Sequence, residues 1–175
     1  MKRADHSGYS IPVKGLPAGT HHFSFEIDGE FFGRYENSEV VGARLSAEVN
    51  VVKSSTLMNI SGAIAGVVSV ECDRCLDELE LPIETEFSLI VKLTKDVDEE
   101  DDEIMMMDQS EGEMDLSQLL YDTVILSLPL QRVHDEGNCN PEMIEKLRSL
   151  SGSGGEESED EDTVSPFSVL KKLKN

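Results

Sequence analysis

The alternation of apolar and polar residues between Leu79 and Leu93 constrains the fold more than any other feature of the sequence. Nearly all odd positions in this segment are apolar, whereas most even positions are glutamate, serine or lysine. A period of two places the apolar side chains on one face of a strand and the polar ones on the other. One wet face is typical of an antiparallel strand. Pro82 has no N–H to donate, so we expect this section to lie at an edge or a bulge.

Earlier segments have the same period of two and predict further strands. The segments are residues 20–28, 43–53 and 56–66. Gly62 weakens the last of them, because glycine contributes no side chain to packing. We expect a turn at Asp28 and Gly29 after the first strand, and a turn at Gly66 that leads into the apolar run before the cysteines.

The apolar spacing becomes helical after residue 114. Asp115 is a plausible N-cap for this helix, and Pro129 should end it. Asn140 and Pro141 begin a second predicted helix. Its apolar residues should form one buried side: Met143, Ile144, Leu147 and Leu150. Residues 104–107 predict a short strand. The fold class is therefore α+β, a mainly antiparallel sheet or partly closed barrel with two or three short helices and acidic flexible segments.

The chain divides into four parts. Residues 1–19 are predicted to form an N-terminal arm, and residues 20–150 a single α+β domain. Residues 96–103 interrupt that domain with an acidic loop whose charges repel one another. Residues 151–163 read as an acidic Gly/Ser linker. Residues 164–175 follow as a docking segment, too short for a stable isolated helix.

The apolar stripe of this C-terminal docking segment consists of three residues: Phe167, Leu170 and Leu173. They share one face if the segment is helical. The segment could dock onto the sheet of its own chain or onto a partner.

Charge narrows the class of partner. The chain has 36 acidic and 15 basic residues, a net charge of -21. The acidic excess is uneven along the chain. Residues 1–95 contain 14 acidic and 9 basic residues, whereas residues 96–175 contain 22 acidic and 6 basic residues. Such a field repels nucleic-acid phosphate and attracts basic proteins. The alternative explanation of the acidic residues is that they only keep the protein soluble.

The sequence has neither an apolar run long enough for a membrane helix nor a secretory signal pattern, and it has only three cysteines. We expect a cytoplasmic protein.

Two of the three cysteines form a C-x-x-C pair at Cys72 and Cys75. With His134 and Cys139, which lie in the loop between the predicted helices, they would make a Cys3His zinc site. A thiol redox pair is a rival reading, although the surrounding acidic residues should disfavour a thiolate. A third reading is a β-turn in which Leu76 anchors the hairpin. No catalytic motif accompanies the pair, so nothing in the sequence argues for an enzyme.

The segment VECDRCLDELELPIETEFSLIV resembles the central signature of the YceD-like proteins, bacterial factors linked to accumulation of large-subunit ribosomal RNA. The residues that match its C-x-R-C-L pattern are Cys72, Arg74, Cys75 and Leu76. The later segment DLSQLLYDTVILSLPLQRVH is also similar, and it contributes Asp115, Leu116, Asp122, Ser127, Leu128, Pro129 and His134. Cys139 lies where many members have a cysteine. The ending SPFSVLKKLK departs from the family pattern at Ser165 and Phe167.

The resemblance implies a cytoplasmic, non-enzymatic factor that supports large ribosomal subunit assembly or its RNA precursor. Charge then favours binding of a basic ribosomal protein or assembly factor, with Arg74 and Leu76 as candidate contact residues. Direct binding of ribosomal RNA precursor is the alternative. It would need a local basic patch, for which the candidates are Arg34, Arg44, Lys53 and Arg74. A thiol redox protein is the third hypothesis.

Overall fold

The fold is built on an open five-stranded sheet. The computed structural model describes residues 8–36, 38–94, 105–108 and 111–151. The strands are β2 (Gly19–Asp28), β3 (Val40–Lys53), β4 (Leu57–Glu71), β5 (Glu78–Thr94) and β6 (Met105–Asp108). Strands β2 to β5 pair antiparallel in chain order, and the short β6 pairs parallel with β5. Because the order is linear, the described strands form a sheet and not a closed barrel. The predicted α+β class is confirmed.

Several predicted segments lie outside the described residues. They are the acidic loop 96–103, the linker apart from Ser151, and the docking segment with Phe167, Leu170 and Leu173.

Strand β5 has the predicted alternation. The side chains of Leu79, Ile83, Val91 and Leu93 are buried, whereas the glutamates between them are exposed. Strand β6 pairs only with residues 91–94 of β5. At Pro82 the outer edge of β5 therefore has no described strand beside it, which agrees with the edge position expected from its missing N–H.

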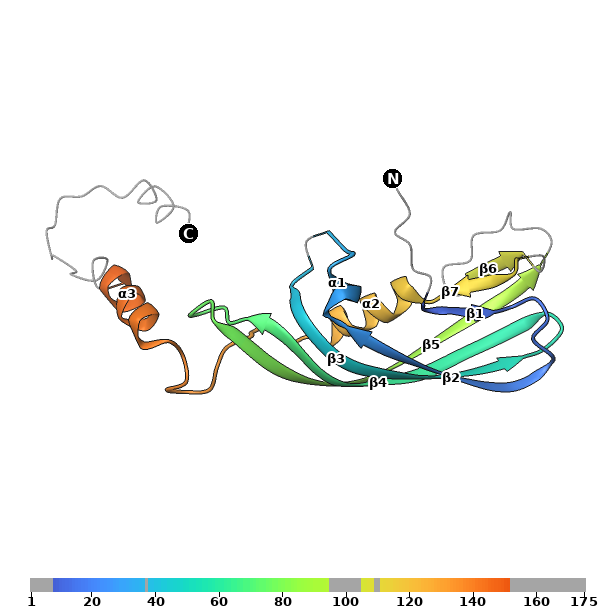
Figure 1. The fold of residues 1–175 in the computed structure, drawn as a ribbon, viewed down its shortest axis with the longest axis horizontal. Helices are drawn as coiled ribbons and strands as arrows, with labels where there is room; N and C mark the ends of the chain where they lie inside the picture. Colours follow the sequence, from blue (N-terminus) through green and yellow to red (C-terminus); the bar gives the residue numbers. More distant parts are fainter. Residues whose placement is uncertain (1–7, 37, 95–104, 109–110, 152–175) are drawn as a thin grey trace, which may run out of the picture.

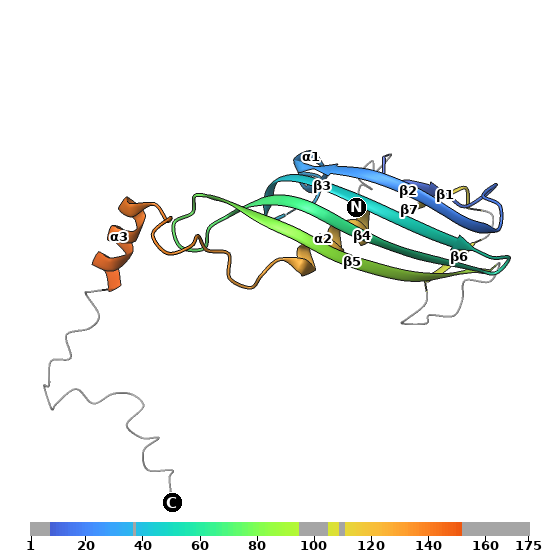
Figure 2. The same ribbon diagram turned by 90° about the horizontal axis from the view of Figure 1, so that it is seen from below.

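One face of the sheet is covered and the other is open. Helix α1 (Gly29–Phe32), helix α2 (Ser117–Ser127) and the antiparallel pair of β1 (Ser10–Pro12) with β7 (Glu113–Asp115) lie on the same side of the sheet (Figures 1 and 2). Their apolar side chains complete the core, among them Ile11, Phe31 and Leu120. No described element covers the opposite face (Figure 2).

Two glycines in β4 do not have the predicted effect. The strand runs without a turn through Gly62 and Gly66 to the cysteine turn, so the turn expected at Gly66 is wrong. A Cβ at Gly66 would lie 2.2 Å from the backbone oxygen of Arg44, and its φ is +146°. A Cβ at Gly62 would lie 2.6 Å from the ring of Phe87. Both glycines allow neighbouring backbone or side-chain atoms to approach β4 closely. This close approach, and not a turn, explains why glycine occupies these positions.

The turn expected at Asp28 and Gly29 is also different. Helix α1 begins there, and the Asp28 carboxylate accepts a hydrogen bond from the Phe31 N–H at 3.1 Å. Asp115 accepts from the Ser117 N–H at 2.8 Å, one residue before the N-cap position of α2 at Leu116. The aspartates thus satisfy free N–H groups as capping residues do.

Helix α3 (Pro141–Ser151) begins as predicted, with the Asn140 side chain accepting from the Glu142 N–H at 3.1 Å. The buried side expected for this helix is wrong. None of its residues is buried, and Leu147 and Leu150 are 44% and 74% exposed. The helix lies beyond the end of the sheet, where no strand is beside it to cover its apolar side (Figure 1).

Replacing Gly66 with alanine should lower the free energy of unfolding by at least about 2 kcal/mol, because the new Cβ meets backbone atoms and the φ is strained. Gly112→Ala is the control, since nothing lies within 4 Å of its added Cβ. Chemical denaturation measures both. Equal stability of the two variants would contradict the close approach in β4.

Candidate metal centre

The connection between β4 and β5 is a tight turn built around the two cysteines. The Cys72 N–H donates to the Asp77 carbonyl at 2.9 Å, and the Leu76 N–H donates to the Cys72 carbonyl at 2.9 Å. These bonds close the hairpin and leave the thiols of Cys72 and Cys75 on its inner side. Both residues are buried, with 0% and 1% exposure.

The loop between α2 and α3 brings the other two predicted ligands to this turn. His134 Nδ1 lies 3.4 Å from Cys75 Sγ, and Cys139 Sγ lies 4.0 Å from Cys72 Sγ. All four ligand atoms lie within 4.8 Å of one another. The sequence separations are 59 and 67 residues. The prediction that folding joins these two halves is therefore confirmed.

Two of the six distances among the four ligand atoms match a tetrahedral zinc ion. Zn–S bonds of about 2.3 Å place two sulfurs about 3.8 Å apart, and Zn–N bonds of about 2.0 Å place sulfur and nitrogen about 3.5 Å apart. The observed 4.0 Å and 3.4 Å differ from these values by about 0.2 Å or less. Three sulfurs and one imidazole are a usual ligand set of structural zinc. The protein supplies four ligands, so no position is left open for a substrate.

The imidazole of His134 is oriented by its second nitrogen. Nε2 lies 3.1 Å from the carbonyl oxygen of Glu78, to which it can donate its proton. That tautomer leaves the lone pair of Nδ1 directed at the sulfurs. Metal-ligating histidines commonly have such a carbonyl partner, which fixes both the tautomer and the ring.

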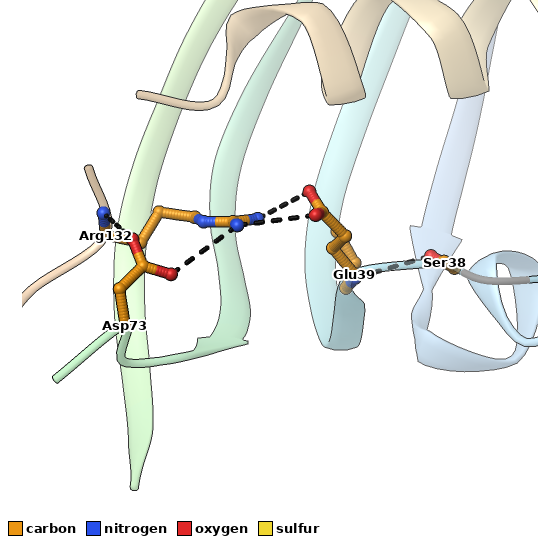
Figure 3. A network of polar contacts seen from close by, with 5 residues as sticks. Ser38, Glu39, Asp73 and Arg132 are labelled. Carbon is orange, nitrogen blue, oxygen red and sulfur yellow. Dashed lines mark hydrogen bonds and ion pairs between the residues drawn. The ribbon is translucent and has the colours of Figure 1, made fainter. Parts of the chain in front are cut away.

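A polar network holds the His134 segment against the cysteine turn (Figure 3). The Asp73 N–H donates to the Arg132 carbonyl at 2.7 Å, and the Arg132 N–H donates to the Asp73 carboxylate at 2.8 Å. The Arg132 guanidinium binds both carboxylate oxygens of Glu39, the nearer at 2.5 Å. Sequence reasoning missed Arg132 and Glu39. Arginine two residues before a candidate ligand was the only local signal, and nothing in the sequence linked it to residue 39.

The environment of Cys72 favours a thiolate. Burial alone would raise the pKa of this thiol, but hydrogen bonds from the backbone of Cys75, His134 and Arg74 outweigh burial and lower the pKa to about 6. The acidic neighbours predicted the opposite direction, but the backbone hydrogen bonds to the Cys72 sulfur lower its pKa instead. The hydrogen bond with Cys72 is also the largest cause of the raised pKa of His134.

Leu76 does not anchor the hairpin as one reading of the turn predicted. Its φ is +63°, the only positive φ at a described residue other than glycine. Its side chain is 60% exposed. A left-handed backbone costs an ordinary residue about 1 kcal/mol or more, so glycine would suit this position better. The chain thus keeps a strained leucine whose side chain contributes little to the core.

The candidate basic patch is mostly engaged in contacts within the protein. Arg74 donates to the His134 carbonyl, and Arg44 forms an ion pair with Glu80 at 2.8 Å. Lys53 donates to the Val13 carbonyl at 2.5 Å and to the Leu16 carbonyl at 2.8 Å. These three cations stabilise the fold and are less available to phosphate.

Comparison with known families supports the resemblance seen in the sequence. A family model described as "Large ribosomal RNA subunit accumulation protein YceD" matches residues 60–174. The chain belongs to the YceD family. The matched range includes all four residues of the Cys3His group and begins within β4. Comparisons with the curated proteins and with the solved structures gave no significant match.

Membership of the YceD family associates the chain with accumulation of large-subunit ribosomal RNA. No helix in the described parts of this YceD family member combines the length and the apolar character needed to cross a membrane.

In the metal-free protein we expect one thiol to ionise with a pKa of about 6. The ultraviolet absorbance of the thiolate should rise through that pH and should lose this step in Cys72→Ser. Cys139→Ser is the comparison: burial and its hydrogen bond with Cys72 raise the pKa of Cys139, so the step should remain in this variant, although its midpoint can shift because the hydrogen bond with Cys72 is altered. The depressed pKa of Cys72 stabilises the metal-free fold at alkaline pH, and this contribution is lost as the pH falls from about 9 towards 6. A titration in which no thiol ionises below pH 8 would contradict this account.

Proposed function

We propose that this protein is a cytoplasmic, non-catalytic factor that supports accumulation of large-subunit ribosomal RNA by binding a basic ribosomal protein or assembly factor. The observation that carries the proposal is the charge of the open sheet face, on the side that no described element covers (Figure 2).

Four glutamates are arranged around small residues on this face. Across one row Glu26 pairs with Ser46, which pairs with Ala65, and Ala65 pairs with Glu84. The next row has the same pattern of carboxylates around a small residue: Ser24, Glu48, Ala63 and Glu86. All four glutamates are exposed, and none forms an ion pair with a described cation.

Removing any one of these charges would change little, but together they form a field. Glu84 and Glu86 lie about 7 Å apart along a strand, and positions two strands apart are separated by about 10 Å. In water each such pair repels by roughly 0.4–0.6 kcal/mol before screening. These two distances do not exceed the Debye length of about 10 Å at 0.1 M salt, so part of this repulsion persists. Glu26 and Glu84 are three strands apart, about 14 Å, and their repulsion is screened more strongly. A multiply cationic segment would relieve all of these repulsions at once.

The small residues make the face accessible to a bound segment. A shallow hollow of about 470 Å³ lies beside the second row. The residues that line it are Glu48, Asn50, Ser61, Gly62, Ala63, Glu86, Phe87 and Ser88. Lysine or arginine side chains entering it would meet carboxylates at two sides of the hollow.

Direct binding of ribosomal RNA precursor has less support. Binding to phosphate requires free lysine or arginine to release counterions. Arg44 is on this same open face, but it is paired with Glu80. The face therefore favours cationic polypeptide over RNA. A thiol redox function is also less supported, because the Cys3His geometry suits a closed metal site.

We further propose that zinc occupies the Cys3His group and has a structural role. The ligand set, the spacing and the carbonyl that orients His134 all support this assignment. Bound zinc would supply a cross-link between the cysteine turn and the loop before α3. Its binding free energy would add to the stability of the fold.

His134→Ala should lower the zinc content of the purified protein well below the wild-type value of about one ion per chain. It should also lower the free energy of unfolding by about 3 kcal/mol or more, since metal-binding energy is folding energy. His22→Ala is the matched control, because His22 is exposed on β2 and away from the cluster. Metal analysis and chemical denaturation check both values. Wild-type protein prepared without chelator that carries no zinc would sink the assignment.

Affinity capture of the full chain from its native host, with nuclease treatment, should recover a basic ribosomal protein or assembly factor. Replacing Glu26, Glu48, Glu84 and Glu86 with glutamine should weaken the complex roughly tenfold and flatten its salt dependence. The control changes net charge equally at exposed glutamates elsewhere: Glu30, Glu111, Glu113 and Glu142.

Two results would count against the basic partner. One is capture that depends on intact RNA and yields no basic protein after nuclease treatment. The other is an equal loss of affinity in both sets of glutamine variants, which would show that net charge matters and the open face does not. A gel shift of ribosomal RNA precursor at physiological salt tests the alternative directly.

A further inference from the structure

We propose that Leu76, together with Val41, forms an apolar anchor site for the basic partner at the end of the sheet. This inference rests on the proposed function and locates one contact on the protein. The partner segment would combine an apolar side chain with neighbouring lysine or arginine. The side chain of Leu76 is exposed although its backbone is strained.

The backbone of Leu76 is fixed by the cysteine turn. Its N–H donates to the Cys72 carbonyl, and the Cys72 N–H donates to the Asp77 carbonyl. These bonds hold φ at +63°, and the side chain is exposed, whereas Cys72 and Cys75 are buried. A strained residue persists only where the surrounding structure enforces it, and such residues cluster at functional sites. Since glycine would remove the strain, the leucine side chain must have a use that the isolated protein does not show.

Val41 is the second apolar member of this site. It lies at the start of β3 and is 59% exposed. Leu76 and Val41 both line a hollow of about 270 Å³. At about 30 Å³ per water molecule, this volume holds roughly nine waters, enough for a large side chain to displace. An apolar side chain that entered would bury parts of both residues.

Carboxylates beside the hollow define the charge of the partner. Glu71, which also lines it, lies directly opposite Glu78 in the pairing of β4 with β5. Both are exposed, and neither forms an ion pair with a described cation. Like charges directly opposite each other destabilise a sheet. A lysine or arginine beside the inserted side chain would neutralise this repulsion, so charge complementarity favours a cationic polypeptide over the chain's own acidic linker.

The anchor site is built on the rigid part of the turn. Arg132 also lines the hollow, and its ion pairs with Glu39 and Asp73 hold its side chain in place (Figure 3). A pre-organised wall lowers the entropy that a partner must lose on binding. By fixing the cysteine turn, the Cys3His group would also fix the position of Leu76.

The test separates this contact from the stability of the fold. Leu76→Asn introduces a residue that tolerates the left-handed backbone, and it removes the apolar side chain. Leu76→Gly removes both the side chain and the strain. We expect both variants to keep the wild-type zinc content and a midpoint of denaturation at or above the wild-type value, because the strain is relieved, and to bind the captured basic protein roughly tenfold to a hundredfold more weakly. Leu130→Asn, at a leucine that is 101% exposed, should bind as the wild type does.

A photo-crosslinking residue at position 76 or at position 130 of the full chain, expressed in the native host, identifies the occupant. Position 76 should cross-link to a lysine- or arginine-rich segment of a protein, and position 130 should not. Cross-links from position 76 to residues 152–175 of the same chain or to a second copy would overturn the anchor.

Two outcomes of the binding measurement distinguish this inference from the proposed function. If the unaltered chain captures a basic protein and both Leu76 variants bind it with wild-type affinity, the anchor is wrong and the proposed function stands. If the unaltered chain yields only RNA, both are wrong.

Discussion

The convergence of two distant chain segments on the turn after β4 is the constraint on which the rest of the structure depends. Cys72 and Cys75 come from a hairpin, whereas His134 and Cys139 come from a loop that follows α2. Val133, Cys139 and Met143 of the second segment pack against the core but are only partly buried. We propose that a metal ion held by these four ligands joins the two segments, as is usual in small domains. The Arg132 network adds a second link at the same place.

The two faces of the sheet differ in character: one packs into the apolar core, and the other is the proposed binding face. Apolar residues at alternate positions bury one face under β1, β7, α1 and α2. The alternation necessarily places the remaining side chains on the other face. There the chain has glutamates around alanine and serine in the middle of the sheet, with Arg44 paired to Glu80 on the same face. This pattern does not stabilise the isolated protein, because like charges repel. It becomes favourable only beside a cationic partner, which connects the fold to the proposed role in ribosome assembly.

Much of this could be predicted from sequence because the determining patterns are local. A period of two identified β2 to β5, and Asn140 with Pro141 identified the start of α3. The metal-ligand types and spacing selected all four residues of the Cys3His group. The predictions failed where contacts between distant segments determine the local conformation or the burial of a side chain. Gly66 predicts a turn because the sequence does not reveal that the backbone of Arg44 lies beside it in the sheet. The amphipathic pattern of α3 predicts a buried side, yet Met143 is only partly buried against the core and Leu147 and Leu150 are exposed. The left-handed backbone of Leu76 follows from the closed cysteine turn and not from its residue type.

Amide hydrogen exchange of the full chain, with zinc and after its removal by a chelator, tests the central role of the Cys3His group most directly. If zinc joins the two segments, its removal should accelerate exchange of the Leu76 N–H and of the Asp73 N–H, which donates to the Arg132 carbonyl. Exchange in the middle of β3 and β4, far from the turn, should change much less. Equal exchange at the turn with and without zinc would contradict the account, because the turn would then be held by the protein alone.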